Sequence, residues 1–278
     1  MPDHSNLLAI LFALASALTI AWGTVVRHRI ALTAPSGKAP ILEVIKRPLW
    51  WAGLSTALIG YGLQVVALGF GTLLVVQPIL VLSMVFTLVL SAAMERRVAS
   101  ARELIWSFIL TTAVATLVIV GNPLPGTGGT WLRWLLAVTI GGGILLLIDA
   151  IAHRRPPQKA LLTGLVTGAT FGFVAVFSKA TVDVAVAGGL MAMLTSWVFY
   201  AVIIGATVGT AIQQTSFNAG DLRNSLPAMT VAEPITAFSL GYLVLGEKLQ
   251  ATDWEWLLMG LALIAMVAAI FGLSRANT

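Results

Sequence analysis

Long apolar runs recur along the whole chain and limit its possible folds more than any other feature. Each of nine runs has about 18 residues or more, enough to cross the hydrocarbon core of a bilayer. They cover approximately residues 7–26, 48–70, 72–94, 104–120, 131–152, 160–182, 188–213, 226–245 and 254–273. Only 10% of the 278 residues are charged, against about 25% in soluble domains. The sequence therefore predicts an all-α integral membrane protein with about nine transmembrane helices.

The basic residues are distributed unevenly between the connections. If the N-terminus lies outside, all of the 16 lysines and arginines except Arg133, Lys179 and Lys248 fall on the cytoplasmic side. Cytoplasmic connections carry an excess of Lys and Arg, so this distribution predicts an N-out, C-in, multi-pass protein of a bacterial cytoplasmic (inner) membrane. The net charge of +5 thus reflects topology, and no nucleic-acid partner is expected.

The sequence contains no pattern that indicates catalysis. It has no cysteine and only three histidines, which are scattered near the expected interfaces, and it has neither an HExxH motif nor a P-loop. No enzymatic activity and no cofactor are expected, and a metal site is left undetermined.

The run that ends in Glu247-Lys248 contains an acid, Glu233, at membrane depth. A charge there costs about 2.5 kcal/mol or more on insertion scales, so it indicates a functional group. Pro234 follows directly and cannot donate to the Thr230 carbonyl, which leaves that carbonyl free beside the acid. Transporters build sites at interrupted helices of this kind. Glu233 and Thr230 are therefore predicted to bind a substrate or a coupling ion.

An earlier run repeats this plan, with Gln77-Pro78 in the place of Glu233-Pro234. When Arg97 is set on Lys248, the following 25 or so residues align without a gap. We expect two inverted repeats, a common design of secondary transporters. Residues 1–122 would form the first repeat with four spans, 123–130 an external Gly/Pro-rich linker, and 131–278 the second repeat with five spans. Pro78 and Pro234 are the predicted hinges.

Other polar residues at depth have two interpretations each. Tyr61 and Gln64 lie three residues apart on one helical face and would form either an interhelical hydrogen bond or a substrate contact. Gln77 is a further candidate for a substrate contact. Gln214 and Asn218 belong to a polar inner connection that is either a plain loop or a gate.

Three further candidates lie near the interfaces. Asp149 would snorkel to the interface or pair with the bases of the following His153-Arg154-Arg155 segment, or act in a proton relay. Lys179 would snorkel outward or pair with an acid across a cavity. Trp22 is interpreted as an interfacial anchor, with substrate stacking as the alternative. The glycines of the sixth span indicate close helix packing: Gly164, Gly168 and Gly172.

The pattern of proline, apolar run and Gly-Glu-Lys-Leu from Pro234 to Leu249 resembles the repeat ends of the drug/metabolite transporter (DMT) superfamily, EamA-like. The segment from Trp50 to Ser91 is similar to the NIPA-type magnesium transporter branch and its bacterial relatives. That resemblance implies the transporter fold over essentially the whole chain. Magnesium-transporting members tend to have an acid after the glycine equivalent to Gly60, where this chain has Tyr61.

Three functions follow as expectations. The first is a secondary transporter that moves a small metabolite or drug-like solute by alternating access, coupled through Glu233. The second, implied by the resemblance, is a magnesium or divalent-cation transporter. The third is a lipid-handling or assembly protein of the membrane without an aqueous substrate. A homodimer is left open by the glycine-rich faces.

Overall fold

The computed structural model of the protein describes residues 6–33, 48–94, 96–126, 128–155, 158–218 and 222–276. The regular secondary structure of this part of the chain is helical apart from two strands of two residues each. Seven of its helical segments are long and apolar enough to cross a membrane. Two shorter apolar helices, Leu58–Phe70 and Trp197–Gln213, coincide with the other predicted runs. The chain is therefore a helical multi-pass membrane protein, as its apolar runs predict.

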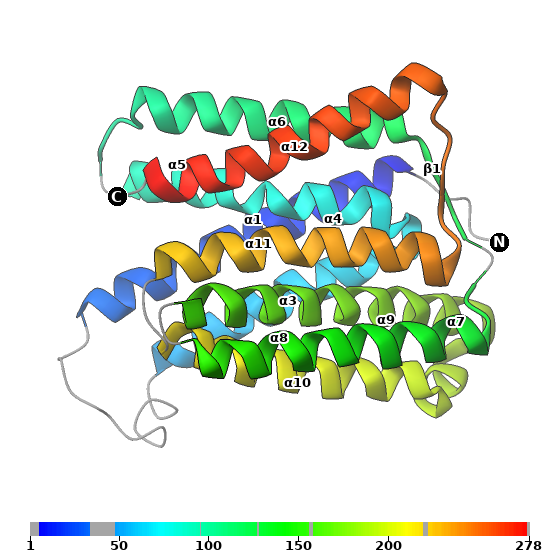
Figure 1. Ribbon diagram of the computed structural model, residues 1–278. Coiled ribbons are helices and arrows are strands. Elements are labelled where there is room, and N and C mark those ends of the chain that lie inside the picture. The colour runs from blue at the N-terminus through cyan, green and yellow to red at the C-terminus, as the bar shows by residue number, and fades with distance from the viewer. Residues whose placement is uncertain are drawn as a thin grey trace.

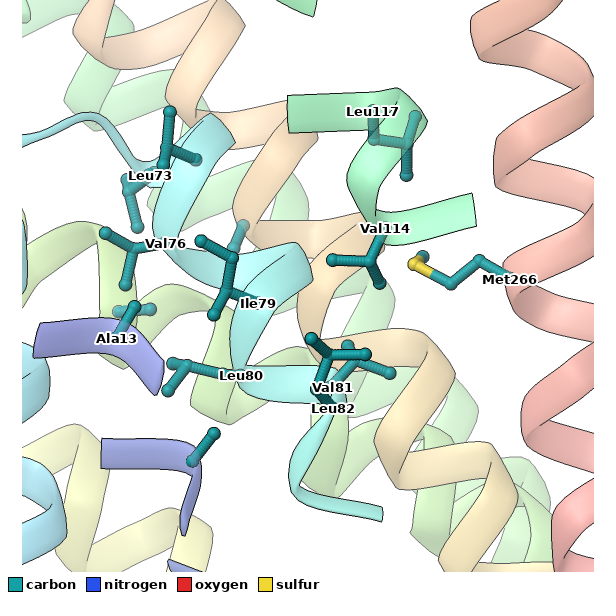
Figure 2. Packing of buried hydrophobic residues seen from close by; sticks show 14 of the residues in the cluster. Ala13, Leu73, Val76, Ile79, Leu80, Val81, Leu82, Val114, Leu117 and Met266 are labelled. Atoms are coloured by element: carbon teal, nitrogen blue, oxygen red, sulfur yellow. The ribbon is translucent and has the colours of Figure 1, made fainter. Parts of the chain in front are cut away.

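The first half of the chain packs around a short central helix. Its elements are α1 (Asn6–Thr33), α3 (Pro48–Phe70), α4 (Leu73–Val81), α5 (Ser83–Met94) and α6 (Ala101–Gly121). Every residue of α4 is buried, because neighbours cover it on several sides. Figure 2 shows its apolar side chains close to Ala13 of α1, and to Val114 and Leu117 of α6. The core of this half is thus built around α4.

The rod formed by α4 and α5 is interrupted at Leu82, one turn after Pro78. The Leu82 N–H donates to the Ile79 carbonyl, three residues back, at 3.0 Å, which tightens the turn. Pro78 lacks an N–H and cannot bond the Leu74 carbonyl. The interruption therefore lies beside the proline at which the sequence predicts a hinge.

The second half contains one very long helix, α9. The elements of this half are α7 (Trp131–Leu136), η1 (Ala137–Gly141), α8 (Gly142–Arg154), α9 (Lys159–Thr195), α10 (Trp197–Asn218), α11 (Leu222–Leu240), η3 (Gly241–Leu245) and α12 (Asp253–Ala276), where η1 and η3 are π-helical. Helix α9 packs most extensively on α11 and α10. A φ of 76° at Gly189 interrupts α9 near its end. The next helix begins at Trp197, so the predicted start of the seventh span at residue 188 is wrong.

The close packing predicted from the glycines of α9 is confirmed. A Cβ atom on Gly168 would lie 2.2 Å from the carbonyl oxygen of Met229, and one on Gly172 would lie 2.7 Å from that of Glu233. Such distances leave no room for any side chain, so the backbones of α9 and α11 are in direct contact. These two helices form a tightly packed pair that fixes the backbone of Glu233.

The two ends of the bundle are distinct. Strands β1 (Pro123–Leu124) and β2 (Lys248–Leu249) pair antiparallel and lie at the end where α1 begins, which we call the strand end (Figure 1). Helix α12 finishes at the opposite end of the bundle (Figure 1).

Helices α6 and α12 pack against each other and begin with the same type of cap. Glu103 accepts the N–H of Ser100 at 2.6 Å, and Glu255 accepts the N–H of Thr252 at 2.5 Å. Both are Ser/Thr-x-x-Glu patterns that satisfy free N–H groups at a helix start. The two caps are offset by one residue from the alignment of the predicted repeats.

Candidate functional site

Glu233 lies within α11, and its side chain remains partly accessible. Gly172 of α9 holds its backbone in place from one side. Within the described part of the chain, no ion pair involves its carboxylate. A carboxylate at this depth without a cationic partner is able to take up a proton or a cationic group.

Tyr61 of α3 approaches Glu233 from the other half of the chain. The two side chains interact electrostatically, while α3 itself packs mainly on α1 and α9. Gln64 lies one turn further along α3 and is buried, whereas Tyr61 is 43% exposed. The two residues of the predicted polar face therefore differ in their surroundings.

Gln77 is buried in α4, and among the described residues its Nε2 atom has no hydrogen-bond partner. Helices α4 and α11 run antiparallel (Figure 1), and the Cβ of Leu73 lies 3.7 Å from the position of a Cβ on Gly241. One turn along α4 from Leu73 is Gln77, and one turn back along α11 from Gly241 is Ala237. Gln77 is thus nearer to the strand end than Glu233, on the face of α4 that includes Leu73.

Helix α11 continues through Pro234 and changes to the π-helical η3 only at Gly241. The hydroxyl of Thr230 donates to the carbonyl of Leu226 at 2.9 Å, within its own helix. The change in helix type therefore lies about two turns from the predicted hinge, toward the strand end.

A second acid, Glu247, lies at the strand end and is 1% exposed. Gly246 adopts a φ of 73°, which favours glycine, and turns the chain at the end of η3. The carboxylate of Glu247 accepts the N–H groups of Leu73 at 2.9 Å and of Leu74 at 3.2 Å. These N–H groups open α4 and have no partner within that helix. An acid of the second half thus caps a helix of the first half.

Lys179 of α9 is buried beside this contact, with 4% of its surface exposed. Its Nζ donates to the carbonyl of Leu68, in α3, at 2.9 Å and to Oδ1 of Asp183 at 2.8 Å. Lys179 therefore does not extend outward to the surface, and the acid that pairs with it belongs to its own helix. It also lies close enough to Glu247 to interact electrostatically.

Burial raises the pKa of Glu247 to about 7, although the N–H groups of Leu73 and Leu74 and the charge of Lys179 oppose this effect. We call Glu247, Lys179 and Asp183 the strand-end charge cluster. Of these three residues, the sequence predicted only Lys179 as a candidate. The only signal for Glu247 is an acid directly after a glycine at the end of an apolar run, which is equally typical of an interfacial helix end.

The remaining predicted residues have other partners, are exposed, or lie outside the described structure. Asp149 has its Oδ2 atom 3.5 Å from Nδ1 of His153 on the same helix, in the pairing that the sequence indicates. Trp22 of α1 is 47% exposed. The side chains of Gln214 and Asn218 lie outside the described residues.

Two hollows are open on the surface of the bundle. One, with a volume of about 270 Å³, lies between α6 and α12 and is lined mainly by apolar side chains, and the other borders α10. Neither is lined by Glu233. Among the residues that the structure describes, no three His, Asp or Glu side chains gather as metal ligands would.

The fold and the acid within α11 define a helical multi-pass membrane protein with a polar group at membrane depth. The chain is 55% identical over 284 residues to an uncharacterized protein of Corynebacterium glutamicum, across 99% of this chain and 97% of that protein. It therefore belongs to the same family as that protein. No family model and no solved structure matches the chain.

Proposed function

We propose that the protein is a secondary transporter of the DMT superfamily. It moves a small metabolite or drug-like solute across the cytoplasmic membrane by alternating access, and Glu233 binds the coupling proton or a cationic group of the solute. In this proposal the chain crosses the membrane nine times, with the strand end outside and two inverted repeats of four and five spans.

The observation that carries the proposal is the placement of Glu233. The residue is only partly buried, its carboxylate has no ion-pair partner in the described part of the chain, and it interacts electrostatically with Tyr61 of the other half. Such an acid is costly unless it exchanges a proton or a cation. A site between two halves is what alternating access requires.

Two further features support this reading. Gln77, in the first half, has a buried Nε2 atom without a hydrogen-bond partner in the described structure, a costly arrangement that an acceptor group on a bound solute would relieve. Helices α6 and α12, the last of each proposed repeat, pack together and share their type of cap.

The test is a flux assay in proteoliposomes that contain the purified protein and a pH-sensitive dye. Solutes are added in turn under an imposed proton gradient: a lipophilic cation, amino acids and small amines. We expect at least one class to change the lumenal pH with the native protein and not with Glu233→Gln. The control is Glu255→Gln, which removes an acid that caps α12 within its own half. Proton-coupled flux that persists in E233Q would refute the role of Glu233.

The same vesicles loaded with a magnesium-sensitive dye test the divalent-cation alternative that the resemblance implies. If magnesium enters vesicles that contain the native protein but not those that contain E233Q, the transported substrate is a divalent cation and not an organic solute.

A second candidate function is lipid handling, which the hollow between α6 and α12 favours. Its lining is apolar, with residues such as Phe108 and Leu261, and it opens at the surface of the bundle. A fluorescent lipid that moves between leaflets only in vesicles containing the protein, together with no solute flux, would favour this function over transport.

A further inference from the structure

The two halves of the chain are joined at the strand end by buried polar contacts. Glu247, in the second half, binds the first two N–H groups of α4 in the first half. Lys179, also in the second half, binds the carbonyl of Leu68 in α3 of the first half. Both ends of the α3–α4 hairpin turn are therefore held by charged groups from the opposite half.

These contacts depend on the halves being together. Glu247 and Lys179 are 1% and 4% exposed, and a buried charge is tolerated only while it has partners. If the halves separated at this end, each charge would exchange its protein partner for water. Such an exchange is practicable at an aqueous boundary, where the proposed topology places the strand end.

The start of α4 has a second cap available in its own sequence. Thr72 is the N-cap residue with extended backbone angles, and Thr is a favoured residue at this position. Its side chain makes no capping bond here, and its buried Oγ1 atom has no hydrogen-bond partner within the part of the chain that the structure describes. Glu247 thus takes the place that the hydroxyl of Thr72 would otherwise fill. On separation of the halves, the α4 N–H groups would have an acceptor within one side-chain rotation.

The contact also lies on the line that leads from the strand end to Glu233. Glu233, Ala237 and Gly241 follow one face of α11 at intervals of one turn. An Oε2 atom of Glu247 lies 3.3 Å from the position of a Cβ on Gly241, at the end of this face.

We infer that Glu247 is a latch that closes the strand end of the bundle between the halves. Opening transfers the start of α4 from Glu247 to Thr72 and admits solute along the α11 face to Glu233. The inference rests on the proposed transport function. The structure described is accordingly the form that is closed at the strand end.

The first test measures closure without transport. The chain has no cysteine, so Ala237→Cys introduces a single reporter at a fully buried position between the latch and Glu233. A membrane-impermeant maleimide is applied to intact cells and to inverted vesicles. We expect protection of the reporter in the otherwise native chain. Glu247→Gln leaves one acceptor oxygen for the N–H groups of Leu73 and Leu74, and should increase labelling from the strand-end side roughly tenfold or more.

The matched control is Glu255→Gln in the same reporter background. Glu255 also caps a helix near the strand end, but its partner Thr252 lies in the same half, so we expect the reporter to stay protected. Equal labelling in E247Q and E255Q, or continued protection in E247Q, would overturn the latch. Lys179→Met, which cuts the bond to Leu68, serves as the latch variant if E247Q does not reach the membrane, and the same outcomes apply.

The role of Thr72 is tested by adding Thr72→Val to E247Q. This change keeps the shape of the side chain but removes the acceptor, so the opened form would lose its replacement cap. We expect less labelling than in E247Q alone. Unchanged labelling would overturn the transfer to Thr72.

A reversible cross-link tests whether transport needs the latch to open. The Cβ positions at Leu73 and Gly241 are 3.7 Å apart, within the range of a disulfide. Leu73→Cys with Gly241→Cys should therefore lose transport on oxidation and regain it on reduction. If the cross-linked protein transported as fast as the protein with its disulfide reduced, the latch would be overturned.

The failures of the two proposals are distinguishable. If no variant transports any solute but E247Q still exposes the reporter, the latch stands and the transport function falls. If labelling increases only in inverted vesicles, the latch stands and the proposed orientation falls.

Discussion

Gly168→Ala is the substitution that most directly tests the packing that holds Glu233 in place. A Cβ at position 168 would lie 2.2 Å from the carbonyl oxygen of Met229, 2.8 Å from its Cα and 2.9 Å from its carbonyl carbon. All three atoms belong to the backbone of α11, which cannot rotate away as a side chain would. The two helices would therefore have to separate by about 1 Å to restore ordinary contact distances.

The expected cost follows from two opposing effects. Overpacking of a well-packed interior costs about 1–3 kcal/mol, and the rigid backbone neighbours of Gly168 place this substitution near the upper value. Replacing Gly by Ala within a helix returns about 1 kcal/mol. We therefore expect the free energy of unfolding to fall by about 2 kcal/mol, which lowers the midpoint by about 4–8 °C in a chain of this size.

The measurement is thermal unfolding of the purified protein in detergent, followed by the fluorescence of its 9 tryptophans. The matched control is Gly260→Ala in α12, because a Cβ there would meet no atom within 4 Å. G260A should leave the midpoint unchanged or slightly raised. A midpoint for G168A that equals or exceeds that of G260A would refute the direct backbone contact between α9 and α11.

Three further predictions use the same assay. Glu103→Ala removes the bond from the Ser100 N–H in the α6 cap and the 2.9 Å ion pair with Arg97, and should cost about 1–2 kcal/mol; an unchanged midpoint would contradict this. Ser16→Ala removes the 2.8 Å bond that joins α1 to the Gly60 carbonyl of α3, with an expected cost of about 0.5–1.5 kcal/mol; a midpoint equal to the native one would show that this bond is dispensable. For Glu247, burial raises the pKa from its ordinary value of 4.5 to about 7, so the folded protein holds this proton more tightly than the unfolded chain. The resulting stability is complete below pH 4.5 and lost as the pH rises through about 7. The native midpoint should therefore fall more than that of E247Q between about pH 5 and about pH 8, and parallel profiles would contradict the assignment.

The charges near Glu247 determine whether the pH dependence of the unfolding midpoint can be assigned to this residue. Lys179 and Asp183 of α9 interact with it electrostatically, while α3 and α4 contribute backbone groups at this point. E247Q should show a weaker pH dependence of the midpoint than the native chain, and adding Lys179→Met to E247Q should leave that dependence unchanged.

The helical membrane fold follows from the sequence because lipid leaves few alternatives. An apolar run of sufficient length must satisfy all its backbone groups within a helix, and the described helices coincide with the predicted runs to within a few residues at most ends. The packing of α9 was also predictable, since a small-residue stripe allows two backbones to touch. The start of the seventh span was not, because Gly189 interrupts α9 inside a continuous apolar stretch.

The candidate site was predictable only in part. Glu233 stands out in the sequence because an acid at membrane depth has few structural explanations. Its approach to Tyr61 depends on how α3 and α11 are placed, which no local pattern determines. The same limitation applies to Glu247, whose partners, Leu73 and Leu74, are more than 170 positions earlier in the chain. No feature of the sequence around Asp183, apart from its own charge, indicated that it would be part of a site.

The two acids of the second half are connected through one tightly packed unit. Helices α9 and α11 touch along their backbones, and this pair carries Glu233, while Glu247 follows directly after η3. Each acid interacts with a group of the first half: Glu233 interacts electrostatically with Tyr61 of α3, and Glu247 accepts hydrogen bonds from the start of α4. A displacement of the α9–α11 pair relative to the α3–α4 hairpin would therefore change both contacts at once. Closure of the strand end and the surroundings of Glu233 would then depend on the same motion, which is the coupling that alternating access requires.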